Sequence, residues 1–224
     1  TVTASVFEAL SDGLQEDEVV EYNAILTDKA GNSKTGTAST TTITVDQIAP
    51  IISTSSLASN NSQTTLAKEG DVVTLTIVTN ENIKDKPTVA FTSGDQAVTN
   101  SVSVTGTNKN FSASYTVHAD DTDGVVGISI TASDLNGNTR SNYTVVSSGN
   151  VTVDTTVPAN FTTGTVTAVG GTVVANRWNS TNSSLQVNVA IADDTSLVDG
   201  TVQLLAKVGT GGYENLGSAV TDRK

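Results

Sequence analysis

An acidic turn and an acidic strand end recur in this chain at one spacing. Asp28 opens the stretch "DKAGN", and Asp134 opens "DLNGN" 106 residues later. In both places a polar run follows, then Thr-Val-Asp, three residues and a proline, which is Pro50 or Pro158. A repeat of this length has the size of one small all-β domain, so the chain is predicted to be a tandem array.

The phase of the repeat predicts three modules. Residues 1–46 are expected to form the C-terminal half of one Ig-like module, residues 47–154 a complete module, and residues 155–224 the N-terminal part of a third. We interpret the chain as a segment of a longer array. Little swing is expected between modules, because Pro50 and Pro158 end short linkers and proline fixes φ and restricts the residue before it.

Composition argues against several classes of function. The 224 residues include no Cys and carry a net charge of −12, which argues against nucleic acid and anionic lipid as partners, because both bind basic patches. No apolar run approaches the roughly 20 residues of a membrane span, so no direct membrane insertion is expected. His118 is the only histidine, and its place in an alternating strand predicts solvent exposure. No catalytic residues are predicted, and the chain is not expected to be an enzyme.

Residues of alternating polarity predict the fold. Apolar side chains share one face of "VEYNAILTD", at Val20, Tyr22, Ala24 and Leu26, and the same pattern recurs in "VGISITASD". In the complete module, strands are expected near residues 51–56, 71–79, 87–92, 101–106, 110–118, 125–133 and 143–153. Seven short strands with turn signals between them predict an all-β fold class: tandem immunoglobulin-like β-sandwich modules of Greek-key topology, in an extended array.

That topology gathers acidic loops at the two joints between modules. The predicted metal ligands at the second joint are Glu69, Asp71, Asp121, Asp123, Asp154, Asp193 and Asp194. Those at the first joint are Asp17, Asp46 and Asp134, with Asp12, Glu16 and Glu81 close by. Crowded carboxylates repel one another, and Ca²⁺ binds about six to eight oxygen ligands at about 2.3–2.6 Å, so Ca²⁺ is predicted at the junctions. The alternative is that Asp28 and Asp134 only cap their own turns.

The chain resembles the bacterial Ig-like repeats of giant surface-anchored or secreted adhesins, of the biofilm-associated and type-I-secreted kinds. The resemblance rests on "LASNNSQTTLAKEGDVVTLTI", "DTDGVVGISITASDLNGN", "VTVDTTVP" and "WNSTNSSLQVNVAIADDTSLVDGTVQLLAKV". It departs from the pattern at Asn136, where Ala is more usual, and in the linker "DQIAP". Both departures bear on the identity of the metal ligands.

The resemblance implies a function and a location. Repeats of this kind act as non-catalytic stalks that support cell adhesion and biofilm formation, with calcium at module junctions in several relatives. The implied location is extracellular, at the bacterial cell surface or secreted. The implied partners are neighbouring modules of the same longer chain, and host or matrix glycans or proteins through domains outside this chain.

Two other functions are consistent with the sequence. In the first, the segments at the two ends complete one another between copies by strand addition and build an extracellular filament. In the second, the modules are carbohydrate-binding accessories of a secreted polysaccharide-degrading enzyme, and Trp178 binds sugar. For Trp178 itself, packing over the open edge of the third module is favoured over a sugar platform.

Overall fold

The computed structural model describes residues 13–193 and 195–221. The regular structure of these residues is strand, apart from one turn of 3-10 helix, η1 (Thr195–Leu197). This confirms the prediction of an all-β chain. None of the described residues forms a helix of the length and apolarity that crossing a membrane requires. The chain divides into two compact units, Thr1–Thr155 and Thr156–Lys224.

The first unit begins with a long, irregular hairpin. Its strands are β1 (Val19–Val20), β2 (Ile25–Thr27), β3 (Ser33–Thr35) and β4 (Ile43–Thr44). β1 pairs with β4, with Val19 opposite Thr44, and β2 pairs with β3, with Thr27 opposite Ser33. The apolar face predicted here is not buried, since Leu26 is 80% exposed. We call residues 13–46 the N-terminal hairpin.

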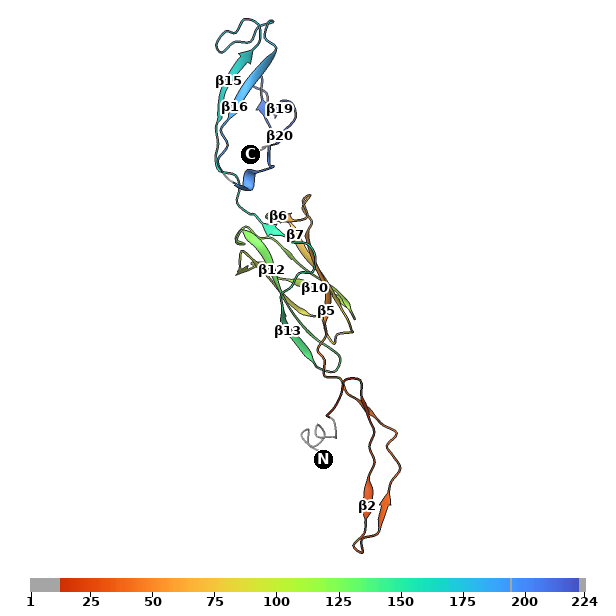
Figure 1. Ribbon diagram of the computed structural model, residues 1–224. Helices are drawn as coiled ribbons and strands as arrows, with labels where there is room; N and C mark the ends of the chain where they lie inside the picture. The colour runs from red at the N-terminus through yellow and green to blue at the C-terminus, as the bar shows by residue number, and fades with distance from the viewer. Residues whose placement is uncertain (1–12, 194, 222–224) are drawn as a thin grey trace. The chain divides into compact units, whose positions relative to one another are not determined.

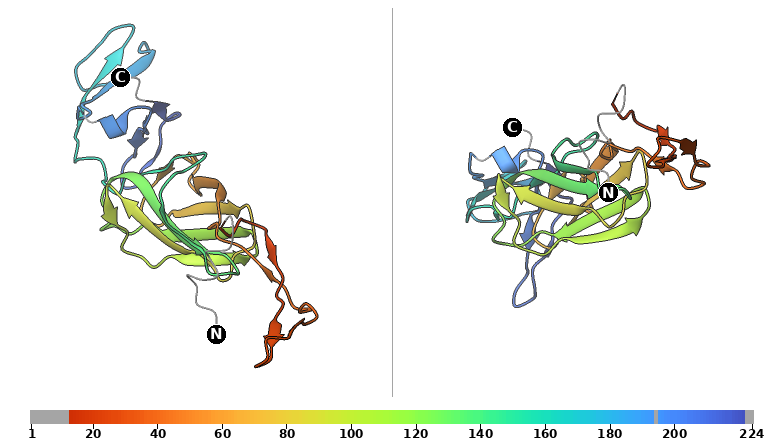
Figure 2. Two further views of the ribbon diagram at one scale, coloured as in Figure 1. Left: turned by 60° about the horizontal axis from the view of Figure 1, so that its bottom comes forward. Right: turned by 90° about the horizontal axis from the view of Figure 1, so that it is seen from below.

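Two sheets follow in the same unit. Their strands are β5 (Ile52–Ser59), β6 (Leu66–Ala67), β7 (Val72–Thr79), β8 (Thr88–Ser93), β9 (Gln96–Ala97), β10 (Ser103–Thr107), β11 (Asn110–Thr116), β12 (Gly124–Ser133), β13 (Thr139–Tyr143) and β14 (Thr152–Val153). One sheet has the order β10-β11-β7-β5, and the other has the order β6-β14-β12-β8-β9 with β13 on β12. Figure 2 shows the strands of the two sheets, which run in colour from orange through yellow and green to teal. This arrangement is consistent with a β-sandwich.

One hydrophobic core lies between the two sheets. Alternate residues of β7 point into it, because successive side chains of a strand point to opposite faces, and Val73, Leu75 and Ile77 are each 0% exposed. β12 supplies Ile130, also 0% exposed, from the facing sheet. Burial of a side chain of this size stabilises the fold by about 1.5–3 kcal/mol. The period-two pattern therefore identified the core strands correctly.

The strand predicted near 143–153 is wrong. Only Tyr143, the last residue of β13, and Thr152–Val153, which form β14, lie in strands. The segment between them crosses to the opposite sheet, where the N–H of Ser147 donates to the carbonyl of Ser55 (2.8 Å). Gly149 has a φ of +75° and lies so close to Leu57 that a Cβ would be 2.1 Å from the carbonyl oxygen of Leu57. The strand is interrupted because this segment contacts the opposite sheet. Alternation of polarity along one strand does not reveal such a contact.

The second unit consists of three two-stranded sheets. β15 (Thr163–Val169) pairs with β16 (Ser184–Val189), β17 (Thr201–Val202) with β20 (Val220–Thr221), and β18 (Leu205–Ala206) with β19 (Glu214–Asn215). β15 and β16 lie side by side in Figure 1. Among the described residues of this unit only Asn182 is buried, so the unit has no closed core. Trp178 is 57% exposed, which contradicts its expected packing over the sheet edge.

Candidate metal centre

The acidic turn after β12 is built around Asp134. One carboxylate oxygen, Oδ1, accepts the backbone N–H groups of Asn136 (2.8 Å), Gly137 (2.6 Å) and Asn138 (2.9 Å). The other oxygen, Oδ2, accepts the side-chain amide of Asn138 at 2.7 Å. Gly137 has a φ of +105°, a conformation that a side chain disfavours. Asp134 therefore does cap its own turn.

The equivalent turn in the N-terminal hairpin has the same construction. Asp28 accepts the N–H groups of Ala30 (2.8 Å) and Asn32 (2.9 Å) and the side-chain amide of Asn32 (2.9 Å). The two turns differ in exposure, because Asp28 is exposed whereas Asp134 is 0% exposed. The same local motif thus stands in two different electrostatic surroundings.

Asp46 lies against the Asp134 turn. The side-chain amide of Asn136 donates to Oδ2 of Asp46, and that of Asn138 is 3.2 Å from both the carbonyl oxygen and Oδ1 of Asp46. Nearby, Nε of Arg140 donates to the carbonyl of Pro50 at 2.7 Å, and Pro50 itself is fully buried. These contacts attach the last residue of the N-terminal hairpin, and the linker after it, to the end of the sandwich.

Glu81 completes a group of three carboxylates at this end of the sandwich. Asp46, Glu81 and Asp134 each offer an oxygen, and the three oxygens lie within 4.8 Å of one another. The loop after β7 positions Glu81, because the hydroxyl of Thr79 donates to the Glu81 carbonyl at 2.6 Å and Ile83 forms a β-bridge with Asp134. Glu16 adjoins the group, and its carboxylate accepts the N–H of Gln47 at 2.8 Å. We call Asp46, Glu81 and Asp134 the acidic triad.

The pKa values of two triad residues, Glu81 and Asp134, are shifted in opposite directions. Burial raises the pKa of Glu81, and the charges of Asp134, Asp46 and Glu16 raise it further. Burial also opposes ionisation of Asp134, but the hydrogen bonds from Asn138, Gly137 and Asn136 outweigh it and hold the pKa of Asp134 below its ordinary value. The site is therefore a negative cluster in which the ionised form of Glu81 is destabilised by burial and by its acidic neighbours.

The acidic triad fits a hard divalent cation. Carboxylate oxygens on opposite sides of a calcium ion are about 4.6–5.2 Å apart, given bond lengths of about 2.3–2.6 Å, and closer when they are not opposite. The three oxygens, all within 4.8 Å of one another, meet that requirement. The set of ligands is all oxygen, which suits Mg²⁺, Ca²⁺ or Mn²⁺ and does not by itself distinguish among them.

The other predicted first-joint ligand lies elsewhere. Asp17 is exposed, has a φ of +63° and donates its N–H to the carbonyl of Val45 at 3.0 Å. It is not a member of the acidic triad, whereas its neighbour Glu16 is close enough to raise the pKa of Glu81. Asp12 lies outside the described residues.

At the opposite end of the sandwich, two predicted ligands, Asp121 and Asp123, accept hydrogen bonds from loop residues. Asp121 is buried and accepts the N–H groups of Thr99 (2.7 Å) and His118 (2.9 Å). One oxygen of Asp123 accepts both the N–H (2.7 Å) and the hydroxyl (2.8 Å) of Thr155. These bonds brace the loops around Asp121 and Asp123.

The remaining predicted ligands that the structure describes belong to no group of three carboxylates within 4.8 Å. Asp71 accepts the amide of Asn61 (2.7 Å) and the N–H of Lys68 (2.9 Å). Glu69 is exposed, and Asp154 is half-buried and donates its N–H to the Ala67 carbonyl at 2.9 Å. Asp193 is exposed in the second unit, and Asp194 lies outside the described residues. Within the described ranges the acidic triad is the one group of three that could hold an ion, so metal at the second joint stays a prediction.

Sequence reasoning missed the two asparagines that hold Asp46. The available signal was position 136 itself, where Asn replaces the Ala30 of the earlier turn and supplies an amide that Ala30 lacks. No model of a known protein family matches this chain, and no curated protein matches it.

Proposed function

We propose that this chain is a non-catalytic spacer segment of a large bacterial adhesin. It consists of Ig-like modules, acts at the cell surface or after secretion, and holds a distal binding domain away from its anchor in cell adhesion and biofilm formation. Its direct partners are the neighbouring modules of the same chain. The proposal rests on the acidic triad, in which Asp46 precedes the linker of residues 47–50 and Glu81 and Asp134 follow it.

Calcium is the ion that best suits this role. Three carboxylates, with water or carbonyl oxygens in addition, satisfy the coordination number of Ca²⁺, and extracellular modules bind it with Kd of about 10⁻⁴–10⁻³ M. Bound Ca²⁺ would neutralise charge that now destabilises ionised Glu81. It would also join Asp46 to Glu81 and Asp134 through bonds stronger than the amide contacts of Asn136 and Asn138.

The linker is already partly restrained without metal. Pro50 is fully buried and its carbonyl accepts a bond from Arg140, while the N–H of Ile51 donates to the side chain of Asn80 at 2.8 Å. Such contacts limit the swing of the linker, and an ion bound to Asp46 would limit it further. Calcium therefore stiffens the spacer in this proposal, and removal of calcium loosens it without unfolding the sandwich.

Paired spin labels test this stiffening directly, because the chain has no native cysteine. Thr35→Cys labels the N-terminal hairpin and Ser103→Cys labels β10, and both positions are exposed. The distribution of distances between the labels is expected to be broad in EDTA and to narrow in millimolar Ca²⁺.

A matched variant controls for effects of calcium elsewhere in the chain. Adding Asp46→Asn to the labelled chain keeps the size of the side chain but removes one triad charge. The distribution in this variant is expected to stay broad in Ca²⁺. Equal widths with and without Ca²⁺ in the parent chain would contradict the proposed stiffening.

A further inference from the structure

The loop before β12 holds the residue that follows Asp154. One oxygen of Asp123, Oδ1, accepts both the N–H (2.7 Å) and the hydroxyl (2.8 Å) of Thr155. The same hydroxyl is 3.4 Å from the carbonyl oxygen of Asp121. Hydrogen bonds to an ionised acceptor are stronger than those between neutral groups. Both the backbone and the side chain of Thr155, the first residue of the second linker, are therefore tied to the sandwich.

The loop that carries Asp123 is itself firmly seated on the turn after β8. Ser93 is buried, and its hydroxyl donates to the carbonyl of Thr122 at 2.7 Å. Gly94 has a φ of +53°, and it lies so close to the loop that a Cβ there would be 2.6 Å from the carbonyl oxygen of Asp123. The close approach of the two backbones leaves Asp123 little room to move.

The N-terminal hairpin holds its own linker in the same way. β1 pairs with β4 as β12 pairs with β14, and in both pairs a valine lies opposite a threonine. Gln47 and Thr155 are each the third residue after that threonine, so they occupy equivalent positions. The N–H of Gln47 donates to a carboxylate oxygen of Glu16 at 2.8 Å, as the N–H of Thr155 donates to Asp123.

The two acceptors stand one position apart in the repeat. Asp17 is the residue that matches Asp123, because each lies two residues before the paired valine. Asp17 has a φ of +63°, and its N–H donates to the carbonyl of Val45 at 3.0 Å. Glu16, whose side chain is one methylene longer than that of aspartate, reaches the linker from the preceding position. The same contact is therefore made twice in one chain by different residues.

Both linkers are equally short beyond the residue that is held. Two residues separate Gln47 from Pro50, and two separate Thr155 from Pro158. Proline fixes its own φ and restricts the residue before it. Few backbone torsions therefore remain that could change the direction of the chain, once the first residue of each linker is held.

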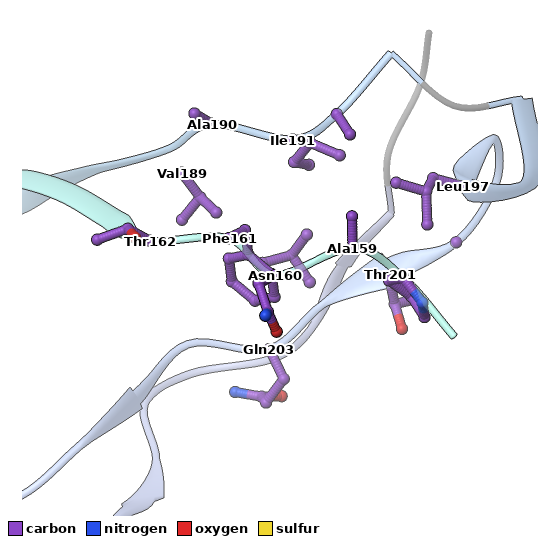
Figure 3. A pocket seen from close by; sticks show the side chains of 14 residues that line it. Ala159, Asn160, Phe161, Thr162, Val189, Ala190, Ile191, Leu197, Thr201 and Gln203 are labelled. Carbon is purple, nitrogen blue, oxygen red and sulfur yellow. The ribbon is translucent and has the colours of Figure 1, made fainter. Parts of the chain in front are cut away.

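The chain enters the second unit directly after the second linker. Residues 158–162 line an apolar cavity of that unit, and Figure 3 shows Ala159 and Phe161 among the lining side chains. The second linker thus runs from a residue held by the sandwich, Thr155, to a segment that belongs to the second unit. A contact that fixes Thr155 therefore acts at the start of the only covalent connection between the two units.

We propose that Glu16 and Asp123 are linker clamps. Each clamp holds the first residue of a linker and so sets the direction in which the chain leaves the strands before it. The inference goes beyond the calcium-dependent stiffening of the proposed function, because the clamps require no metal. Loss of a clamp should let the linker swing more widely in the absence of calcium.

Amide hydrogen exchange measures the clamp on Thr155. In EDTA, Asp123→Ala should speed exchange of the Thr155 N–H by roughly tenfold, because the substitution removes an ionised acceptor. Asp123→Asn keeps an oxygen acceptor of the same size and should retain most of the protection. Asp120→Ala is the matched control, because Asp120 is an exposed carboxylate of the same loop that lies beside His118. This control should exchange at the parent rate.

Paired spin labels measure the swing itself. Ser103→Cys labels β10 and Thr165→Cys labels β15, and both positions are exposed. In EDTA, the distribution of distances between the labels should be broader with Asp123→Ala than in the parent, and unchanged with Asp123→Asn. Because every sample contains EDTA, the result does not depend on calcium binding by the acidic triad. Equal Thr155 exchange in the parent and Asp123→Ala, or equal widths of the two distributions, would overturn the proposal.

Discussion

At the residue scale, one carboxylate in the acidic triad destabilises the fold and another stabilises it. Asp134 receives four hydrogen bonds from its own turn, and these hold its pKa low despite complete burial. Burial and the acidic neighbours raise the pKa of Glu81. The carboxylates of the cluster therefore repel one another, and a bound cation would relieve that repulsion. The raised pKa of Glu81 is the sign of it.

Replacing Glu81 with Gln should therefore stabilise the metal-free chain near neutral pH. Because the folded pKa of Glu81 is raised above 4.5, its contribution to stability is lost as pH rises from that value through the folded pKa. We expect Glu81→Gln to raise the melting temperature in EDTA at pH 7 by on the order of 2–4 °C, and this increase to become smaller as pH falls toward 4.5. A melting series across pH measures this difference.

The contribution of Asp134 to stability depends on pH in the opposite direction to that of Glu81. The lowered pKa of Asp134 contributes stability that is present above pH 3.8 and is lost as pH falls through the folded pKa. The parent chain and Glu81→Gln should therefore lose stability together in acid. Glu69→Gln, an exposed position outside the triad, serves as the control and should not differ from the parent. A melting temperature of Glu81→Gln at or below that of the parent at pH 7 would argue against repulsion in the cluster.

The acidic residues show how much of this site the sequence could predict. The recurrence of Asp46 and Asp134 in a fixed frame placed them, with Glu81, at one joint. The run "DDTDG" has the same composition, yet Asp121 and Asp123 bind backbone groups. Composition does not separate the two cases, because the fold decides which three carboxylates have oxygens within 4.8 Å of one another.

At the element scale, alternation was sufficient for strands that belong to one sheet along their whole length. β7 and β12 follow the period-two pattern, and their inward residues are the core. The failures occurred where a segment leaves its sheet, as at Ser147 and Gly149, or where the predicted apolar face of a strand is exposed, as at Leu26. Periodicity along one strand carries no information about what lies across from it.

The closed core and the open unit should respond differently to truncation of a phenylalanine. Phe91 is 2% exposed and its ring centroid is 4.9 Å from that of Tyr115, so Phe91→Ala should cost about 3–5 kcal/mol in the free energy of unfolding of the sandwich. Phe161→Ala, at a residue 63% exposed, should change the stability of the sandwich by less than about 0.5 kcal/mol. Urea denaturation at low protein concentration measures both, and similar costs would contradict the assignment of one closed core.

At the scale of the whole molecule, negative charge is concentrated where the proposed mechanical function requires stiffness. A chain of net charge −12 gathers three carboxylates where the N-terminal hairpin meets the sandwich, and holds them there with Asn136, Asn138 and a buried Pro50. A divalent cation bound there would relieve the repulsion that raises the pKa of Glu81. Under the proposed function, the calcium concentration around the spacer would set its stiffness.

Calcium titration calorimetry on the intact chain tests that claim most directly. We predict uptake of Ca²⁺ with a Kd of about 10⁻⁴–10⁻³ M, and loss of that binding in Asp46→Asn. Asp95→Asn, at an exposed turn position outside the triad, should bind as the parent does. Absence of calcium binding in the parent chain, or equal binding in Asp46→Asn, would contradict the account.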